Sequence, residues 1–324
     1  MTGHAPAHDS CPWDTAWDTA ERIPHHDRVR LTERDGSRYV LKVARPSTPL
    51  EHEATVARCA ADVRVDNRPI ADRSLRADSA MLVTACDPTA ESLHDRLLRR
   101  WEAPPLTGVG RALAAMHGHR APVRLPDARP ERPRFFPLTP EQHAAMPIGT
   151  VQVLRVLDEH RDARDLLETA AARPPKARTL VHGDCKPDNI RLRRDGSVLF
   201  IDWELGGAGD PIEDLAGAVG ALIAVSVQDR LATAGPTAAD IGRALSEGMN
   251  RAWECVATML AAYADAGAEV ADLDDLVLLT AVKVLCRAQV QAALMGKVGA
   301  TAHVLLQAAL AITRNRDRVA GLLR

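Results

Sequence analysis

The sequence predicts an α+β protein with a small β-rich N-terminal lobe and a larger, mostly helical C-terminal lobe. Three short apolar runs of β type lie within the first 85 residues: 29–31, 38–43 and 80–84. From Gly217 onward the chain is rich in Ala and Leu at helical spacing, which indicates several packed helices. At 324 residues with 46% apolar side chains, the chain can bury a large core. We therefore expect the N-terminal lobe to span residues 1–85 and the C-terminal lobe residues 86–324.

The N-terminal elements follow from turn and cap residues. The first two β-type runs are separated by Glu33-Arg34-Asp35-Gly36, which predicts a hairpin. The stretch Pro46-Ser47-Thr48-Pro49 holds cap residues and prolines that suit a first helical turn, so a helix is expected to start after it. The run 80–84 predicts a strand that ends at Cys86-Asp87-Pro88, where the pattern breaks.

The C-terminal elements alternate between helical periodicity and irregular stretches. Residues 108–117 and 150–172 each place apolar residues at helical spacing, so each is expected to form one helix. Between them, residues 121–147 hold many prolines, which predicts an irregular insertion that could serve as a substrate platform. Two short apolar runs, 179–181 and 197–201, predict strands.

Each of these last two strands ends in an acidic cluster. His182-Gly183-Asp184 follows the first, Asp202-Trp203-Glu204 follows the second, and Asn189 lies five residues after Asp184. An Asp that accepts a hydroxyl proton, followed by an Asn and a second Asp that hold magnesium, is the arrangement that phosphoryl-transfer sites use. The alternative is two hairpin ends with polar turns, and Asp195-Gly196 is itself a turn signal. The combination of H-x-D-x-K-x-x-N with a strand-borne Asp favours a phosphoryl-transfer site whose catalytic loop is 182–189.

This stretch resembles the aminoglycoside phosphotransferase family, which has the bilobal protein-kinase-like fold and carries H-G-D-x-x-x-x-N before a strand ending in D-W or D-F. It is also similar to the HRDLKPEN loop of Ser/Thr protein kinases, because Lys186 lies two residues after Asp184. The resemblance implies transfer of the ATP γ-phosphoryl group to a hydroxyl. Asp184 would accept or orient the hydroxyl proton, and Lys186 would neutralise charge on the γ-phosphoryl group. It further implies that Asn189 and Asp202 coordinate Mg²⁺. In the family an Asp after G-D-P orients the catalytic loop, so Asp214 is expected to be a structural support.

The same resemblance gives a role to Lys42 in the second β-type run. In a kinase-like lobe this Lys reaches the ATP phosphates and is held by a Glu on the next helix. Glu53 is the expected partner, because it shares a helical face with Val56 and Ala60 and so points toward the interior. Glu51 is the alternative.

One feature departs from the kinase pattern. Protein kinases have a glycine-rich turn before the Lys strand, whereas the segment Glu21–Glu33 contains no glycine. Its absence supports a rival function, a pseudokinase scaffold that binds nucleotide or peptide and regulates a partner. The chain nevertheless keeps four polar groups that a scaffold has no physical need to retain: Lys42, Asp184, Asn189 and Asp202.

The acceptor is indicated only by looser matches. The segment Phe135–Pro140, the sequence D-W-E-L-G-G-A-G-D-P and the helical tail are similar to kinase-like proteins of class V lanthipeptide and thioamitide gene sets. That resemblance implies a Ser or Thr acceptor on a ribosomally made precursor peptide, with a separate partner lyase that eliminates phosphate in natural-product biosynthesis. The alternative is an aminoglycoside or other small-molecule antibiotic kinase, because acidic residues between Glu204 and Asp275 could recruit a polycation.

Composition excludes several other partners. A net charge of -2 gives no basic stripe for nucleic acid. We find no run of about eighteen apolar residues to span a membrane and no apolar core of a signal peptide, so a cytoplasmic location is expected. The six cysteines are scattered without ligand-like spacing, so neither a zinc site nor a disulfide framework is expected.

Overall fold

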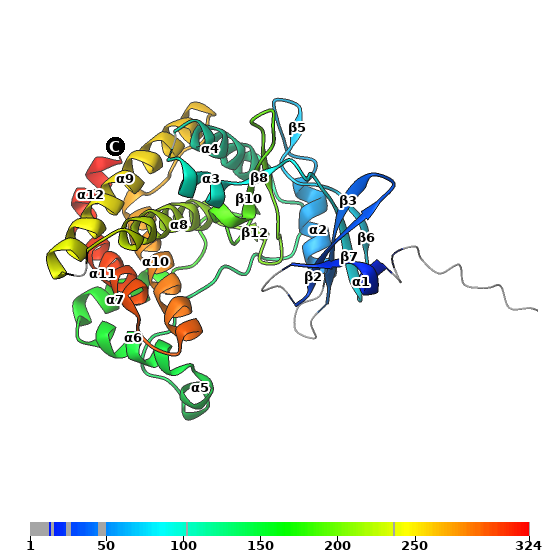
Figure 1. Ribbon diagram of the computed structural model, residues 1–324. Helices are drawn as coiled ribbons and strands as arrows, with labels where there is room; N and C mark the ends of the chain where they lie inside the picture. Colours follow the sequence, from blue (N-terminus) through cyan, green and yellow to red (C-terminus); the bar gives the residue numbers. More distant parts are fainter. Residues whose placement is uncertain are drawn as a thin grey trace, which may run out of the picture.

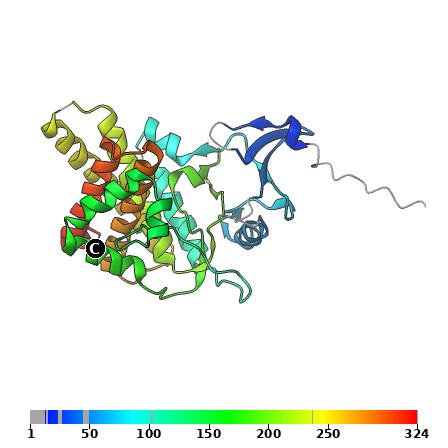
Figure 2. The same cartoon turned by 90° about the horizontal axis from the view of Figure 1, so that it is seen from below.

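The protein has two lobes in the computed structural model, which describes residues 13, 16–23, 27–44, 50–101, 103–235 and 237–323. Figure 1 shows the N-terminal lobe, a sheet with one main helix, beside a larger helical C-terminal lobe. Figure 2, seen from below, shows the same separation. The predicted α+β, protein-kinase-like fold is confirmed.

The elements of the N-terminal lobe are α1 (Ala16–Thr19), β1 (Glu21–Arg22), β2 (Val29–Arg34), β3 (Ser37–Val43), α2 (Leu50–Ala60), β4 (Arg64–Val65), β5 (Arg68–Pro69), β6 (Ser74–Ala77) and β7 (Met81–Cys86). Five of the strands form one antiparallel sheet in the order β1-β2-β3-β7-β6. The predicted hairpin is confirmed, because Arg34 pairs with Ser37 across Asp35-Gly36, and both turn residues have positive φ, as a two-residue hairpin turn of this kind requires. The expected start signal of α2, residues 46–49, lies outside the described residues, and the helix begins at Leu50.

The C-terminal lobe starts with β8 (Glu91–Ser92), α3 (Leu93–Arg99), α4 (Ala103–Gly118), α5 (Pro140–Ala145), α6 (Ile148–Asp158) and α7 (Arg161–Ala172). It continues with β9 (Thr179–Val181), a 3₁₀ turn (Pro187–Asn189), β10 (Ile190–Leu192), β11 (Val198–Phe200) and β12 (Gly207–Gly209). Its last helices are α8 (Pro211–Ala232), α9 (Ala238–Asp265), α10 (Leu273–Met295), α11 (Ala300–Arg314) and α12 (Arg316–Leu322). The lobe boundary at residue 85 stays a prediction; β7 ends at Cys86, and β8 pairs with β10.

Short strands of the C-terminal lobe hold the segment between the lobes. In one small sheet the neighbouring strands are, in order, β11, β10 and β8. A second small sheet pairs β9 with β12. Figure 1 shows β8, β10 and β12 on the side of this lobe that faces the N-terminal lobe. The glycine-rich segment 206–211 therefore contains a strand, because β9 supplies the partner that fixes its backbone.

The expected single helix over 150–172 is wrong. It is divided into α6 and α7 at Glu159 and His160, and both helices pack against α10. The bend lets the apolar faces of both helices lie on α10. The expected irregular insertion, 121–147, is mostly irregular but contains α5, which Thr139 and Gln142 begin with a capping box.

The helical core is built around α8 and α10, which are buried on nearly all sides. By length and apolar composition both helices could cross a membrane, contrary to the expectation from the sequence. In each, 72% of the apolar window is buried inside the fold, as in the central helix of a soluble protein. Val56 and Ala60 of α2 join this same core, which fixes the face of α2 that carries Glu53.

Candidate active site

Lys42 occupies the centre of a cluster of carboxylates at the junction of the lobes. Its Nζ lies 2.7 Å from Oε2 of Glu53, 2.6 Å from Oδ1 of Asp202 and 3.0 Å from Oε2 of Glu204. Burial disfavours its charge, but the nearby carboxylates of Glu53 and Asp202 outweigh burial and raise the pKa of Lys42. Lys42 therefore stays charged and links β3 and α2 to the end of β11.

The choice between the two Glu candidates is decided by burial. Glu53 is buried and contacts Lys42, whereas Glu51 is exposed. A hydrogen bond between the His52 ring and the backbone oxygen of Gly206, at 2.9 Å, further attaches α2 to the segment after β11.

Asp202 adopts an unusual backbone conformation directly after β11. Its φ is 64°, a left-handed value that non-glycine residues adopt rarely and mostly in turns or functional sites. The residue before it, Ile201, donates its backbone N–H to the backbone oxygen of Asn189 at 2.9 Å. Asn189 and Asp202, the two predicted metal ligands, are thus brought together by adjacent backbone.

The catalytic loop holds Asp184 through two neighbours. Nδ2 of Asn189 donates to Oδ2 of Asp184 at 2.9 Å and to its backbone oxygen at 3.0 Å, and Nζ of Lys186 donates to the same Oδ2. Burial opposes ionisation of Asp184, but the charges of Lys186, His182 and Arg287 hold its pKa below its usual range. Asp184 is therefore an ionised carboxylate with a fixed orientation.

Asp214, in the first turn of α8, supports this loop from below. Its fully buried carboxylate accepts hydrogen bonds from the backbone N–H groups of His182 at 2.6 Å and Gly183 at 2.8 Å. Gly183 has φ +79°, and a Cβ there would lie 2.2 Å from the backbone oxygen of Leu205, so only glycine fits. The expected supporting position of Asp214 is therefore what the structure shows.

The oxygen atoms at this junction suit Mg²⁺. Carboxylate oxygens of Glu53, Asp202 and Glu204 lie within 4.8 Å of one another. Asn189 uses its amide nitrogen for Asp184, which leaves its amide oxygen for another partner. Hard oxygen ligands of this kind are those that Mg²⁺ prefers. Asn189 and Asp202 remain the proposed ligands, and Glu204 is a further candidate.

Three charged residues near the site were not assigned from the sequence: Arg28, Glu204 and Arg287. Nη2 of Arg28 lies 3.5 Å from Oε2 of Glu204, and its Nη1 donates to the backbone oxygen of Val43 at 3.2 Å. Arg28 precedes β2 in the segment that lacks glycine, although residues 24–26 of that segment lie outside the described residues. The pairing of Val29 with Lys42 in the predicted hairpin was the available indication that Arg28 lies beside the Lys.

Arg287 lies on α10 on the other side of the catalytic loop. Its charge acts on both Asp184 and Lys186, and the Glu131 carboxylate also acts on Lys186. Within the described residues, the half-buried Arg287 side chain has neither a hydrogen bond nor an ion pair. Asp184 is therefore in contact with the charge of Lys186 and also under the influence of the charge of Arg287.

Two of the acidic residues expected to recruit a polycation lie at the start of α10. Asp275 is about 18 Å along the helix from Arg287, and Asp272 is the N-cap of α10. Lys176 pairs with Asp272 at 3.3 Å and with Asp275 at 2.6 Å, and Arg173 joins Asp275 to Asp210, the N-cap of α8. The acidic wall beside the cleft stays a prediction.

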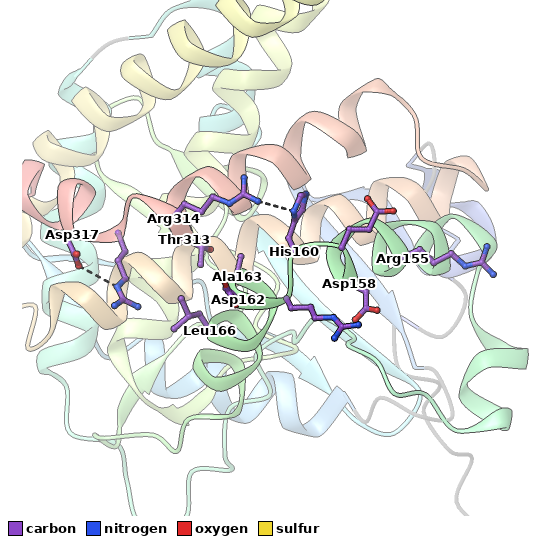
Figure 3. Close-up of a pocket in the computed structure, with 12 residues that line it drawn as sticks. Arg155, Asp158, His160, Asp162, Ala163, Leu166, Thr313, Arg314 and Asp317 are labelled. Carbon is purple, nitrogen blue, oxygen red and sulfur yellow. Dashed lines mark hydrogen bonds and ion pairs between the residues drawn. The ribbon is translucent and has the colours of Figure 1, made fainter.

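Two cavities lie in the C-terminal lobe. One, of about 470 Å³, is lined by residues of the 131–134 segment, the α5–α6 junction and α10. The other, of about 870 Å³, lies between the α6–α7 turn and the α11–α12 turn. Figure 3 shows the mixed charges of this larger cavity, including the contact between Arg314 and His160. No catalytic-loop residue lines it, so its size does not make it the active site.

Comparisons with known proteins agree with this geometry. The sequence model described as "Phosphotransferase enzyme family" matches residues 20–235. The fold is similar to choline kinase from Streptococcus pneumoniae, with a TM-score of 0.54, 12% identity, and coverage of 91% of this chain and 92% of that chain. It is similar to AMP-bound spectinomycin phosphotransferase with the same four values.

A third similar structure is the ethanolamine kinase of Plasmodium vivax, with a TM-score of 0.52, 12% identity, and coverage of 90% of this chain and 82% of that chain. A search of curated proteins gives no match. At these identities the structures show a shared fold, and the family match spans more than half of the chain. The chain belongs to the phosphotransferase enzyme family, and it is an enzyme of the phosphotransferase class.

Proposed function

We propose that the protein transfers the γ-phosphoryl group of ATP to a hydroxyl group, with Mg²⁺ as cofactor. The observation that carries this proposal is the presence of two groups of charged and polar side chains at the lobe junction. Lys42 is held by Glu53 beside Asp202, and Asp184 is held by Asn189 in the loop that faces them. These are the phosphate-positioning and proton-accepting parts that phosphoryl transfer requires.

The chemistry assigns one task to each group. The acceptor oxygen attacks the γ-phosphorus and forms a new P–O bond, while the bond from that phosphorus to the β-phosphate oxygen breaks and ADP leaves with the electron pair. The hydroxyl proton passes to the Asp184 carboxylate, whose depressed pKa keeps it ionised to receive it. Lys186, which is paired with Asp184, offsets negative charge on the transferred phosphoryl group.

Mg²⁺, when bound by Asn189 and Asp202, would neutralise charge on the phosphate oxygens. Lys42 would position the phosphates, because its buried ammonium is held in place by Glu53. For ATP to use Lys42, the contact of its Nζ with Asp202 at 2.6 Å must be shared or exchanged. In this structure the Lys42 ammonium is thus held by Asp202, which is also a proposed metal ligand, and by Glu53.

For the acceptor we propose a Ser or Thr hydroxyl of a peptide, in a natural-product pathway where a partner lyase removes the phosphate. The support is the charge beside the catalytic Asp. Lys186 and Arg287 would repel a polycationic aminoglycoside or a quaternary ammonium group, and the charges of Asp272 and Asp275 are already offset by Lys176. The proposed location is the cytoplasm, where ATP is available.

A small-molecule hydroxyl is the second candidate. It is favoured by the shared fold with kinases whose names specify choline, ethanolamine and spectinomycin. The two candidates differ in the size and charge of the acceptor, so one panel of compounds separates them.

The test is mass spectrometry of acceptors incubated with the protein, ATP and Mg²⁺. The panel contains Ser- and Thr-bearing peptides encoded near the gene, choline, ethanolamine, spectinomycin and an aminoglycoside set. A product heavier by one phosphoryl group, formed by wild type and absent with Asp184→Asn, supports phosphoryl transfer and names the acceptor class. Nucleotide binding without any product would favour the pseudokinase scaffold.

A further inference from the structure

We propose that the 470 Å³ groove along α10 binds an extended acceptor peptide, with Arg287 recognising an acidic residue next to the hydroxyl and an apolar rim holding a side chain farther along. This inference rests on the proposed phosphotransferase function and adds to it a substrate class and a binding surface. We call the cavity and its rim the α10 groove; it is formed by residues 131–134, the α5–α6 junction and the C-terminal half of α10.

The inner end of the α10 groove is connected to the catalytic loop through α8. Lys283, three residues before the groove-lining Cys286, lies 3.0 Å from Glu213, and the neighbouring Asp214 binds the backbone of the loop. Arg287 follows Cys286 in the chain, and its charge acts on Asp184 and Lys186. Arg287 is half-buried and has no hydrogen-bond or ion-pair partner in the part of the chain that the structure describes. A guanidinium that is partly removed from water gains from an anionic partner, and a carboxylate offers it two parallel hydrogen bonds.

One wall of the groove is held in place by buried charges. Arg132 makes two contacts with Glu213, at 2.7 and 2.5 Å, and Lys283 of α10 approaches the same carboxylate at 3.0 Å. Gln289 of α10 accepts from the backbone N–H of Arg134 and donates to its backbone oxygen, both at 2.9 Å. The extended segment 131–134 is thereby fixed along α10, so the groove exists before an acceptor arrives.

The outer end of the groove is apolar and exposed. Val290 and Ala293 line it, and the next residues of α10, Leu294 and Met295, are 76% and 63% exposed. Ile148, at the start of α6, is 59% exposed, and the close contact of Gly149 with Ala292 brings this helix start to the same end of α10. Figure 1 shows α5, α6 and this end of α10 gathered on one side of the lobe. Contiguous exposed apolar side chains mark interaction sites in soluble proteins.

The spacing favours a peptide over a compact metabolite. From Arg287 to Leu294 the helix advances about 10 Å. An extended peptide covers that distance in about three residues. The geometry therefore predicts an acidic side chain beside the acceptor hydroxyl and an apolar side chain about three residues from that acid.

The test compares synthetic Ser peptides by the value of kcat/KM. The reference peptide carries Asp directly beside the acceptor Ser and Leu three residues from the Asp. In one version both residues precede the Ser, and in the other both follow it. Replacing Asp by Lys, or Leu by Ser, should each lower kcat/KM for wild type by about tenfold. Arg287→Ala should lower kcat/KM for the Asp peptide and leave the KM for ATP unchanged, and Arg287→Glu should reverse the preference between Asp and Lys.

Matched variants separate the parts of the proposal. Leu294→Ser should reduce turnover of the Leu peptide and not of the peptide with Ser in its place. Arg155→Ala, which removes an exposed Arg of α6 that lines the larger, distant cavity, should change neither preference. Circular dichroism and thermal unfolding confirm that each variant folds.

The outcomes are distinguishable. If the hydroxyl of a small cationic alcohol such as choline is phosphorylated and no Ser peptide is, the groove assignment is wrong while phosphoryl transfer stands. A rise in the KM for ATP in Arg287→Ala, with the peptide preference intact, would make Arg287 a phosphate ligand and overturn its role in the acceptor site. If no compound is phosphorylated although nucleotide binds, the proposed function itself fails, and the groove assignment with it.

Discussion

Lys42 shows how one residue can hold two lobes together before a substrate binds. It is a buried ammonium in contact with carboxylates of Glu53, Asp202 and Glu204, and Arg28 adds a second cation to the last of these. An uncompensated buried charge is costly, so each group is retained in the fold by the others. The cluster therefore sets three carboxylates against two cations, and Mg²⁺ bound there would offset the excess negative charge.

Arg28 provides the first prediction, because it occupies the segment where kinases place glycine. Its guanidinium is held next to Lys42 by Glu204 and is available to the nucleotide phosphates once metal engages the carboxylates. Arg28→Ala should weaken ATP binding by about tenfold or more, the loss expected for a charge-assisted hydrogen bond. Isothermal titration calorimetry with ATP and Mg²⁺ measures it.

The control for Arg28 is on the same sheet. Arg38→Ala removes an exposed Arg of β3 whose nearest carboxylate, Glu33, is 3.8 Å away at the surface. It should leave nucleotide affinity unchanged. Equal affinities for wild type and Arg28→Ala would show that another group replaces the missing glycine-rich turn.

At the scale of elements, the first turn of α8 serves two neighbouring structures. Asp214 supports the catalytic loop, and Glu213 joins Arg132 and Lys283 in the wall of the α10 groove. Consecutive side chains of a helix point about 100° apart, so neighbouring residues of one turn can contact both the catalytic loop and the groove wall. The start of α8 thus couples the catalytic loop to the groove.

Glu213 provides a prediction on the pH dependence of stability. Burial opposes its charge, but Arg132 and Lys283 lower its pKa to about 2 from 4.5. A lowered folded-state pKa means that the stabilisation is complete above pH 4.5 and is lost as pH falls toward 2. The shift corresponds to about 3 kcal/mol. Urea unfolding at several pH values should show this loss in wild type.

Glu213→Gln isolates that contribution. Its free energy of unfolding should be lower at pH 7 and should fall less than that of wild type between pH 4.5 and 2. Asp265→Asn, at an exposed position of α9, should leave stability at pH 7 unchanged. A parallel decline of wild type and Glu213→Gln over this range would contradict the assignment.

Close packing of α4 against α9 gives a further prediction. A Cβ at Gly110 would lie 2.2 Å from the backbone oxygen of Met259, whereas a Cβ at Gly118, on the same helix, would meet nothing within 4 Å. Gly110→Ala should destabilise the protein by about 1–3 kcal/mol through overpacking. Gly118→Ala should not do so, and thermal unfolding compares the two.

Local signals determined which elements the sequence could predict. The hairpin of β2 and β3 and the strand β7 were predicted because turn residues and apolar runs define them within a few residues. The break between α6 and α7 and the strand β12 were missed, because α10 and β9 decide them from far away in the sequence. Such elements are set by tertiary partners that no local pattern contains.

At the scale of the whole molecule, the same distinction applies to the site. Asp184, Lys186, Asn189 and Asp202 lie within one stretch, so their spacing predicted them as site residues, and Lys42 with Glu53 was predicted from the resemblance to the kinase-like order of elements. Arg28 and Arg287 lie 259 positions apart and flank the site only in the folded chain. Their chemistry is a product of the fold, which brings the sheet of one lobe and the central helix of the other to one loop.

The charges that an acceptor would meet also depend on the whole molecule. The acidic residues suggested a polycation from the sequence, and Asp275 lies about 18 Å along α10 from Arg287, where it pairs with Lys176. The charge of Arg287 acts on Asp184, and apolar side chains near the end of the same helix are exposed. The fold thus places charges of both signs along one helix.

The central claim is that Asp184 takes the proton from the hydroxyl of the acceptor, while other residues of the site bind ATP. The most direct measurement is ADP release with ATP, Mg²⁺ and the acceptor identified by mass spectrometry, for wild type and Asp184→Asn, with nucleotide affinity measured in parallel. We predict a fall in kcat of about 10²- to 10⁴-fold for Asp184→Asn with nearly unchanged ATP affinity. Turnover by Asp184→Asn at the wild-type rate would contradict the account.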